Sequence, residues 1–110
     1  MKQGDLWLGN LNPVKGREQR GIRPVLILSG DAMNDTLGIC IVCPLSTKVK
    51  KYAGCVVLKK DKINGLEADS EIITFQIRTL AKERLIRKIG RITEPQLEKV
   101  KSGLMEILKY

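Results

Sequence analysis

The segment GREQRGIRPVLIL, residues 16–28, places Arg17, Glu18, Gln19, Arg20 and Arg23 directly before an apolar run. The chain contains no histidine, which removes the commonest general acid and base and the Ser-His-Asp and Cys-His nucleophile systems. It also lacks a G-x-x-x-x-G-K-[ST] phosphate loop and an evident metal-binding pair of carboxylates. The remaining groups are arginine, a carboxylate and hydroxyls. They suit phosphoryl transfer, in which a fixed guanidinium stabilises the charge of the transition state.

Arg23 is the best single candidate for that guanidinium. It precedes Pro24, so its backbone is expected to be extended at the start of a buried strand, with its side chain facing the loop. The alternative is an ordinary surface arginine that extends its head group into water or pairs with a nearby acid.

A second polar stretch, PLSTKVKK at residues 44–51, follows another apolar segment. Ser46 and Thr47 could bind a phosphate oxygen there, with Lys48 and Lys50 holding the flanking nucleic-acid backbone. The alternative is an ordinary polar strand exit.

Charge favours a polyanionic partner. Lysine and arginine total 20 against 12 acidic residues, which gives a net charge of +8 and a pI near 9.6. Nucleic acid is the obvious candidate because of the sum of the basic patches, although each patch taken alone is better explained as a solvated face. Aromatic residues make up only 4% of the chain, so we expect binding through charge, backbone groups and loops. Trp7, Tyr52 and Phe75 are expected in the core or an interface.

The cysteines predict a reducing environment and no metal site. Cys40 and Cys43 form a C-x-x-C pair within GICIVCPL, which is typical of a strand, so their side chains should point to opposite faces. We expect them to be buried as small apolar residues, with Cys55 as a third free thiol. No apolar run approaches the roughly 20 residues of a membrane-spanning helix and no signal peptide is evident, so we expect a soluble cytoplasmic protein.

Periodicity predicts a single domain, residues 1–110, that is mostly β with a C-terminal helix. Short apolar segments bounded by turn residues indicate a small antiparallel barrel or sandwich. The expected strands are 5–9, 24–29, 39–45, 55–58, 71–76 and 85–92, with loops at 9–16, 29–35 and 59–70. A helical turn is expected near residues 80–83.

The C-terminal segment TEPQLEKVKSGLMEILK has the pattern of a helix. Thr93 and Gln96 match a capping box. The apolar residues that recur at helical spacing and should pack on the barrel are Leu97, Val100, Leu104 and Leu108. Gly103 inside this pattern predicts a close approach to another backbone.

Three segments occur in order along the chain: GDLWLGNLNPVKGREQRGIRPVLIL, CPLST and FQIRTLAKERL. They make the chain similar to the MazF/PemK toxins of bacterial toxin–antitoxin systems. The similarity runs from about Gly4 to the final helix. It implies an SH3-like antiparallel β-barrel with a C-terminal α-helix, of the MazF/PemK/CcdB-like kind, assembled as a homodimer. It also implies sequence-specific, metal-independent cleavage of single-stranded RNA, with no cofactor, that leaves 2′,3′-cyclic phosphate and 5′-hydroxyl ends and inhibits translation and growth. A small acidic antitoxin is the implied protein partner.

The resemblance assigns the catalytic roles to Arg23, Glu18 and Ser46. Arg23 would stabilise the phosphorane and deliver a proton to the leaving oxygen. Because the pKa of arginine, above about 12, makes it a poor base, removal of the 2′-proton falls to Glu18 or to a phosphate oxygen. Many relatives have threonine at the position of Ser46; serine keeps the hydroxyl but loses the methyl that restricts its rotamer, and Thr47 could take the role if the loop shifts by one residue.

The expected RNA-binding residues surround these three. Gln19, Arg20 and Lys48, together with Thr47 and Lys50, would contact flanking nucleotides. Gln76 and Arg78 would support the groove or, alternatively, form a polar network at a dimer contact. Two other functions remain open at this point: a CcdB-like toxin that binds gyrase, and a catalytically silent binding protein of the same fold.

Overall fold

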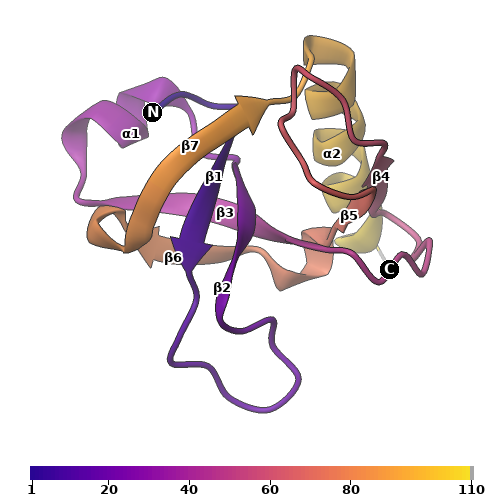
Figure 1. Cartoon of the computed structure of the whole chain (residues 1–110), viewed down its shortest axis with the longest axis horizontal. Helices are drawn as coiled ribbons and strands as arrows, with labels where there is room; N and C mark the ends of the chain where they lie inside the picture. Colours follow the sequence, from indigo (N-terminus) through magenta and orange to yellow (C-terminus); the bar gives the residue numbers. More distant parts are fainter. Residues whose placement is uncertain (110) are drawn as a thin grey trace.

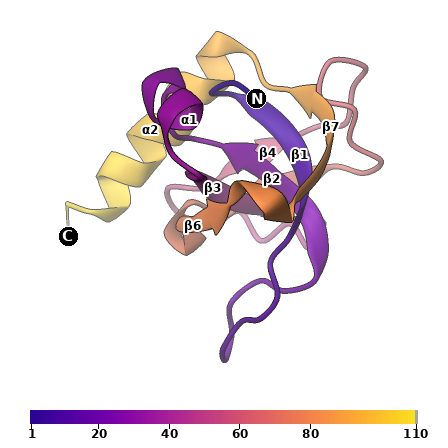
Figure 2. The ribbon, with the colours of Figure 1, turned by 90° about the vertical axis from the view of Figure 1, so that its left-hand side faces the viewer.

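The computed structural model describes residues 1–109 and shows a curled antiparallel sheet with one long helix packed at its end (Figure 1). Six of the seven strands follow the order β4-β5-β3-β2-β1-β7, and the seventh, β6, pairs with β3 beside this path. Their bounds are β1 Asp5–Asn10, β2 Ile22–Ile27, β3 Ile39–Ser46, β4 Val56–Leu58, β5 Ser70–Ile72, β6 Arg78–Ala81 and β7 Leu85–Arg91. The predicted mainly-β class is therefore confirmed, with the sheet curled into a half-barrel (Figure 2). Five predicted strands lie within two residues of their expected bounds.

Strand β3 organises the sheet. Its central residues pair with β2, Val25 lying opposite Pro44. Along its other edge, the first half pairs with β6 and the last two residues, Leu45 and Ser46, pair with β5. The C-terminal end of β3 therefore emerges beside both β5 and the start of β2, where several loops converge.

Helix α2, Glu94–Ile107, has the predicted capping box. The Thr93 hydroxyl accepts a hydrogen bond from the Gln96 backbone N–H at 3.3 Å, and the Gln96 side-chain oxygen accepts one from the Thr93 N–H at 2.9 Å. Leu97 and Val100 are buried against the sheet. Leu108, in contrast, is 70% exposed, so its expected packing is wrong: the helix ends before it. Neither α2 nor any other described helix is long and apolar enough to cross a membrane.

The close approach predicted at Gly103 is confirmed. A Cβ atom built on Gly103 would collide with the carbonyl oxygen of Gly54, and one built on Gly54 would collide with Gly103 in turn. Only a pair of glycines lets α2 lie this close to the segment that leads into β4.

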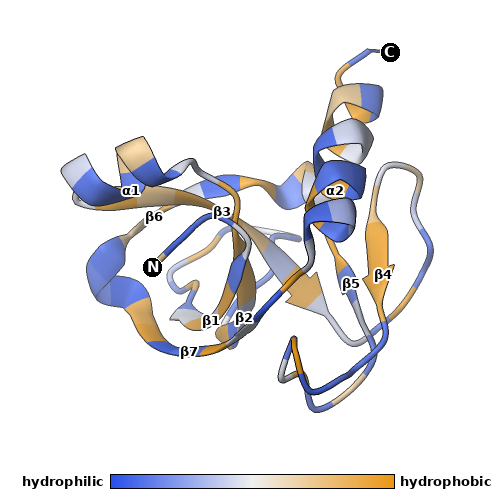
Figure 3. Cartoon of the chain, turned by 90° about the horizontal axis from the view of Figure 1, so that it is seen from above, coloured by the Kyte–Doolittle hydropathy of each residue, from blue (hydrophilic) through white to orange (hydrophobic). Residues whose placement is uncertain are grey.

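Two apolar clusters cover opposite faces of the sheet, and apolar stretches along the strands are visible in Figure 3. The cluster beneath α2 contains Leu6, Leu26, Cys43, Leu45 and Val100 among others. The other contains Leu11, Val25, Ile27, Cys40, Val42 and Leu80. The two cysteines lie in different clusters, as the strand pattern predicts. Burial, and to a lesser extent Cys55, raises the pKa of the Cys43 thiol to about 12.

Two segments differ from the predicted elements. Part of the predicted loop 29–35 forms a short helix, α1, Asp31–Thr36. Its polar residues are used internally: the Ser29 hydroxyl donates to the Asn34 side-chain oxygen at 2.6 Å, and the Asn34 amide donates to the Ser29 carbonyl at 2.8 Å. The two residues thus brace a helix that their types alone suggest as a turn.

The predicted strand 71–76 is also wrong. Only Ser70–Ile72 is a strand; a 3₁₀ turn, η1, Thr74–Gln76, follows it, and then β6, which the sequence did not predict. The chain has to move from the last residues of β3 to its first half, and η1 makes that step. Of the turn predicted near 80–83, residues 82–83 belong to a second 3₁₀ turn, η2, Lys82–Arg84, whereas residues 80–81 are the end of β6.

Candidate functional site

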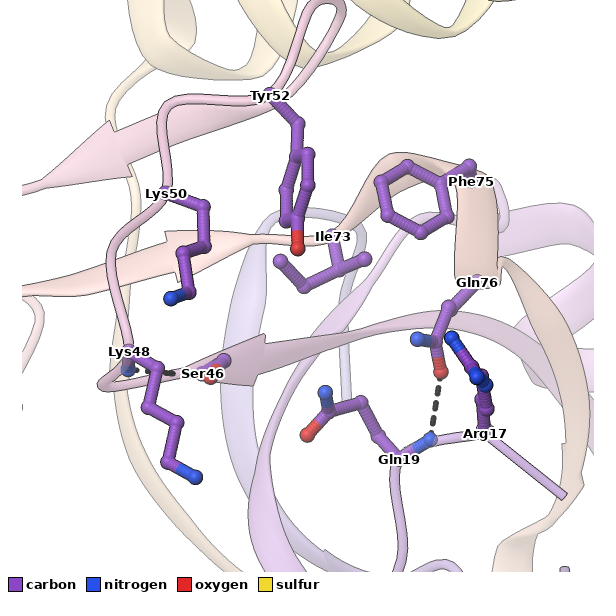
Figure 4. A pocket seen from close by; sticks show the side chains of 9 residues that line it. All are labelled: Arg17, Gln19, Ser46, Lys48, Lys50, Tyr52, Ile73, Phe75 and Gln76. Atoms are coloured by element: carbon purple, nitrogen blue, oxygen red, sulfur yellow. Dashed lines mark hydrogen bonds between the residues drawn. The ribbon is translucent and has the colours of Figure 1, made fainter.

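A cavity of about 310 Å³ opens where β3 ends (Figure 4). Three segments contribute to it: the β1–β2 loop, the β3–β4 loop and the turn that follows β5. Its lining residues are Arg17, Gln19, Ser46, Lys48, Lys50, Tyr52, Ile73, Phe75 and Gln76. Five of the predicted site residues, Gln19, Ser46, Lys48, Lys50 and Gln76, are thus brought together although up to 57 positions separate them in the chain.

The β1–β2 loop contributes Gln19 and Arg17. The Gln19 backbone N–H donates to the Gln76 side-chain oxygen at 2.6 Å (Figure 4), so η1 anchors the loop at this point. Glu18 is exposed and does not line the cavity. One of its carboxylate oxygens accepts a hydrogen bond from the Lys15 backbone N–H at 3.0 Å. Arg20 is also directed at its own loop, donating to the Gly16 carbonyl at 3.0 Å.

Ser46 is the hydroxyl that faces the cavity. It is only 7% exposed, and its oxygen accepts a hydrogen bond from the Lys48 backbone N–H at 3.1 Å. Successive side chains of a strand point to opposite faces. Accordingly Thr47 lines a different cavity, with Pro24 and Ser70.

Arg23 lies on β2, two residues before Val25, and Ser46 ends β3, two residues after Pro44. Val25 and Pro44 form the last pair of the β2–β3 register. Arg23 is partly buried, and its Nε donates to the Arg20 carbonyl at 2.8 Å. It is not among the residues that line the cavity.

Arg78 supports the site from behind. Its guanidinium donates to the Leu11 carbonyl at 3.1 Å, which ties the start of the β1–β2 loop to β6. It does not line the cavity.

Glu71 is a site residue that the sequence analysis missed. Its side chain is completely buried. Its carboxylate accepts three backbone hydrogen bonds, from Lys50 at 2.8 Å, Lys51 at 3.1 Å and Tyr52 at 2.8 Å. Hydrogen bonds to an ionised carboxylate are stronger than neutral ones, so Glu71 fixes the β3–β4 loop in a conformation that includes a positive φ of 57° at Lys51. A glutamate within the otherwise apolar segment EII, residues 71–73, was the available signal.

The two aromatic residues of the lining were also missed. Tyr52 is 46% exposed and Phe75 is 48% exposed, so neither belongs to the core, and the alternative expectation, an interface, stays a prediction. Their rings meet edge to face, with centroids 5.2 Å apart and planes at 87°. Both project from connecting segments rather than from strands, which is why strand-like surroundings in the sequence misplaced them.

The site is electropositive. Arg17, Lys48 and Lys50 line it, whereas the salt bridges among the described residues lie elsewhere, at Lys88–Asp5 and Lys101–Glu98. Three cations that no carboxylate neutralises within the described chain favour an anionic ligand.

Comparison with known proteins identifies the family. The model of the family described as PemK-like, MazF-like toxin of type II toxin-antitoxin system matches residues 2–108. The chain belongs to this family. The predicted resemblance is thereby confirmed over nearly the whole chain.

Members of the family with known sequences and structures agree with this assignment. "Endoribonuclease EndoA" of Bacillus subtilis is 36% identical over 105 residues, which are 94% of this chain and 90% of that protein. "Endoribonuclease MazF9" of Mycobacterium tuberculosis is 32% identical over 109 residues, or 94% and 92% of the two chains. The crystal structure of MazF from Deinococcus radiodurans superposes with a TM-score of 0.86 at 27% identity and covers 100% of this chain and 97% of that one. The names of the two relatives bear out the expected enzyme class, and the structure bears out the expected fold.

Proposed function

We propose that this protein is an endoribonuclease toxin that cleaves single-stranded RNA at short sequence motifs without a metal. The observation that carries the proposal is the cavity at the end of β3, where a buried hydroxyl, Ser46, lies among three cations. The family and the names of its relatives support the reaction class.

In this reaction the RNA 2′-oxygen attacks the adjacent phosphorus, the bond from phosphorus to the 5′-oxygen breaks, and the 2′-proton is removed while the 5′-oxygen gains one. The products end in a 2′,3′-cyclic phosphate and a 5′-hydroxyl. Arg23 stabilises the charge of the phosphorane and delivers the proton to the leaving oxygen, and the Ser46 hydroxyl donates to a phosphate oxygen. Glu18, whose carboxylate has one backbone partner on the exposed loop, or a phosphate oxygen takes the 2′-proton.

The other predicted residues have supporting roles. Gln19, Lys48, Lys50 and Gln76 contact the nucleotides from the cavity wall, and Arg20 contacts them from the exposed loop. Arg78 acts through the Leu11 carbonyl that it holds. Thr47 faces away from this cavity, so we assign it no catalytic role.

The proposed assembly is a cytoplasmic homodimer, each chain a single domain, that a small acidic antitoxin neutralises. The net charge of +8 supports a polyanionic antitoxin as it supports RNA. The toxin-antitoxin description of the family supports the same pairing.

The test is cleavage of a long unstructured RNA in the presence of a chelator, followed by mapping of the ends. We expect cyclic-phosphate and 5′-hydroxyl ends, and an Arg23→Ala variant that is at least about 100-fold slower, because loss of one group that stabilises transition-state charge has this effect. Arg91→Ala, an exposed arginine on β7 outside the cavity, is the control and should retain activity. Intact RNA with folded wild-type protein would contradict the proposal, and inhibition of gyrase would then be assayed.

A further inference from the structure

The aromatic pair on the cavity rim has unoccupied ring faces. Tyr52 and Phe75 are about half exposed, although aromatic side chains gain most from burial. In an edge-to-face pair, the ring that presents its edge keeps both faces free of its partner, and the other ring keeps one. The buried side chain of Ile73 lines the cavity beside them (Figure 4). The rim therefore offers a flat apolar ligand a surface on which to stack.

The β1–β2 loop, which forms another wall of the cavity, carries a hydrogen-bond acceptor that no donor contacts. The side-chain oxygen of Gln19 is buried and has no hydrogen-bond partner in the described structure. Its own backbone is fixed by the bond from its N–H to Gln76. A buried acceptor left unpaired is unfavourable, so a ligand that brings an N–H group to this point would satisfy it.

The positive charge of the cavity lining further restricts the class of ligand. Arg17, Lys48 and Lys50 line the same cavity as the aromatic pair, and no carboxylate is among the lining residues. Glu71, the nearby acid, is buried behind the loop with its oxygens occupied by backbone N–H groups. An anion that carries a planar ring with N–H groups at its edge fits all three features, and a nucleotide has this chemistry.

We propose that Tyr52, Phe75 and Gln19 form a subsite that holds one unstacked nucleobase of the RNA, its face on the aromatic pair and an N–H of its edge donating to the Gln19 oxygen. The inference rests on the proposed function for the identity of the polymer. It adds that this chain binds one base by stacking, whereas its low aromatic content predicted binding through charge, backbone groups and loops.

Binding without cleavage tests the subsite directly. The probe is a short single-stranded RNA with 2′-deoxy nucleotides at each candidate attack position, so that no cleavage occurs, and with 2-aminopurine placed at successive positions. At one position, wild-type protein should quench the fluorescence by stacking. Phe75→Leu and Tyr52→Leu should abolish that quenching and weaken binding about tenfold, within the range measured for single base–aromatic stacks. Met105→Ala, an exposed apolar residue on α2, is the control and should match wild type.

A second measurement separates this proposal from the general one. Replacing the base at the quenched position by an abasic ribose should slow cleavage by wild-type enzyme about tenfold and should leave Phe75→Leu unaffected. Normal cleavage that ignores both the abasic site and the Phe75 substitution would overturn the subsite and leave the ribonuclease intact. Absence of all cleavage with quenching retained would overturn the ribonuclease and leave the subsite. A loss of dimer mass in both leucine variants would show that the pair is covered by a second copy and would also overturn the subsite.

Discussion

The two loops that form the walls of the cavity are held in different ways. The β3–β4 loop is fixed from below by one completely buried carboxylate, that of Glu71, which accepts three backbone hydrogen bonds. The β1–β2 loop extends away from the sheet (Figures 1 and 2). Two side chains from other segments, Gln76 and Arg78, bond to its backbone, whereas the hydrogen bonds of its own side chains at Glu18 and Arg20 lie at the surface.

This difference suggests that one loop is rigid and the other adjusts to the ligand. Exposed hydrogen bonds open at lower free-energy cost than buried ones. The β3–β4 loop therefore presents its lysines and Tyr52 in a fixed arrangement, whereas the β1–β2 loop can adjust when RNA enters. The wall that carries Glu18 is the adjustable one, so its position outside the cavity lining is compatible with the role proposed for it.

The largest expected effect comes from weakening the fixed wall. Glu71→Gln keeps one acceptor oxygen but replaces the other with an amide that cannot accept, and it removes the charge from all three hydrogen bonds. We expect the free energy of unfolding to fall by about 3 kcal/mol, measured by urea denaturation. In protein that remains folded, KM for RNA should rise more than kcat falls, because the residue positions the binding lysines and does not touch the reacting phosphate.

Glu67→Gln is the matched control, since Glu67 is exposed and belongs to the β4–β5 loop. Equal stability of the two variants would show that Glu71 does not hold the loop.

The contrast also explains what could be predicted from the sequence. The residues of the adjustable wall lie in one continuous segment, GREQRG, and Ser46 lies at the end of a strand. Local sequence patterns were therefore enough to find Gln19, Ser46 and Lys48. Most strands and the capping box of α2 were found for the same reason. Each depends on side chains that are neighbours in the chain.

The fixed wall depends on distant neighbours. Glu71 meets residues 50–52 only because β5 pairs with the last two residues of β3. Phe75 meets Tyr52 only because the chain turns through η1 on its way to β6. Neither strand pairing nor this turn has a local pattern of its own. A glutamate beside Ile72 and Ile73 could mark Glu71 as unusual, but it could not show which loop the carboxylate holds or that Tyr52 and Phe75 meet.

A smaller effect is expected at the adjustable wall. Gln76→Ala removes the acceptor that anchors the Gln19 backbone N–H. Because this bond is partly buried and has no formal charge, we expect a loss of stability of about 1 kcal/mol or less. RNA cleavage should nevertheless fall about tenfold, since the loop loses its attachment. Hydrogen exchange should show faster exchange at Gln19 and unchanged exchange at Tyr52.

Gln3→Ala, which removes a side-chain hydrogen bond to the Leu28 carbonyl far from the cavity, is the control. If exchange accelerates equally in both loops of the Gln76 variant, the two loops open as one unit, and the proposed difference in their rigidity is wrong.

The smallest expected effect is a pH dependence of the free energy of unfolding, which arises from β3, the strand that supports both walls. Cys43 lies on β3 three residues before Ser46, and its pKa in the folded protein is raised from 9.0 to about 12 by burial. The folded state thus holds the thiol proton more tightly than the unfolded state. The stabilising contribution is complete below pH 9 and is lost progressively between pH 9 and pH 12.

Between pH 8 and pH 10, the free energy of unfolding should therefore fall by about 1 kcal/mol more in wild type than in Cys43→Ala. Lysines titrate in the same range in both proteins, so the difference between the two slopes isolates the thiol. Identical slopes for wild type and Cys43→Ala would mean that water reaches the strand beneath Ser46, and that wall would then be no more rigid than the loop opposite.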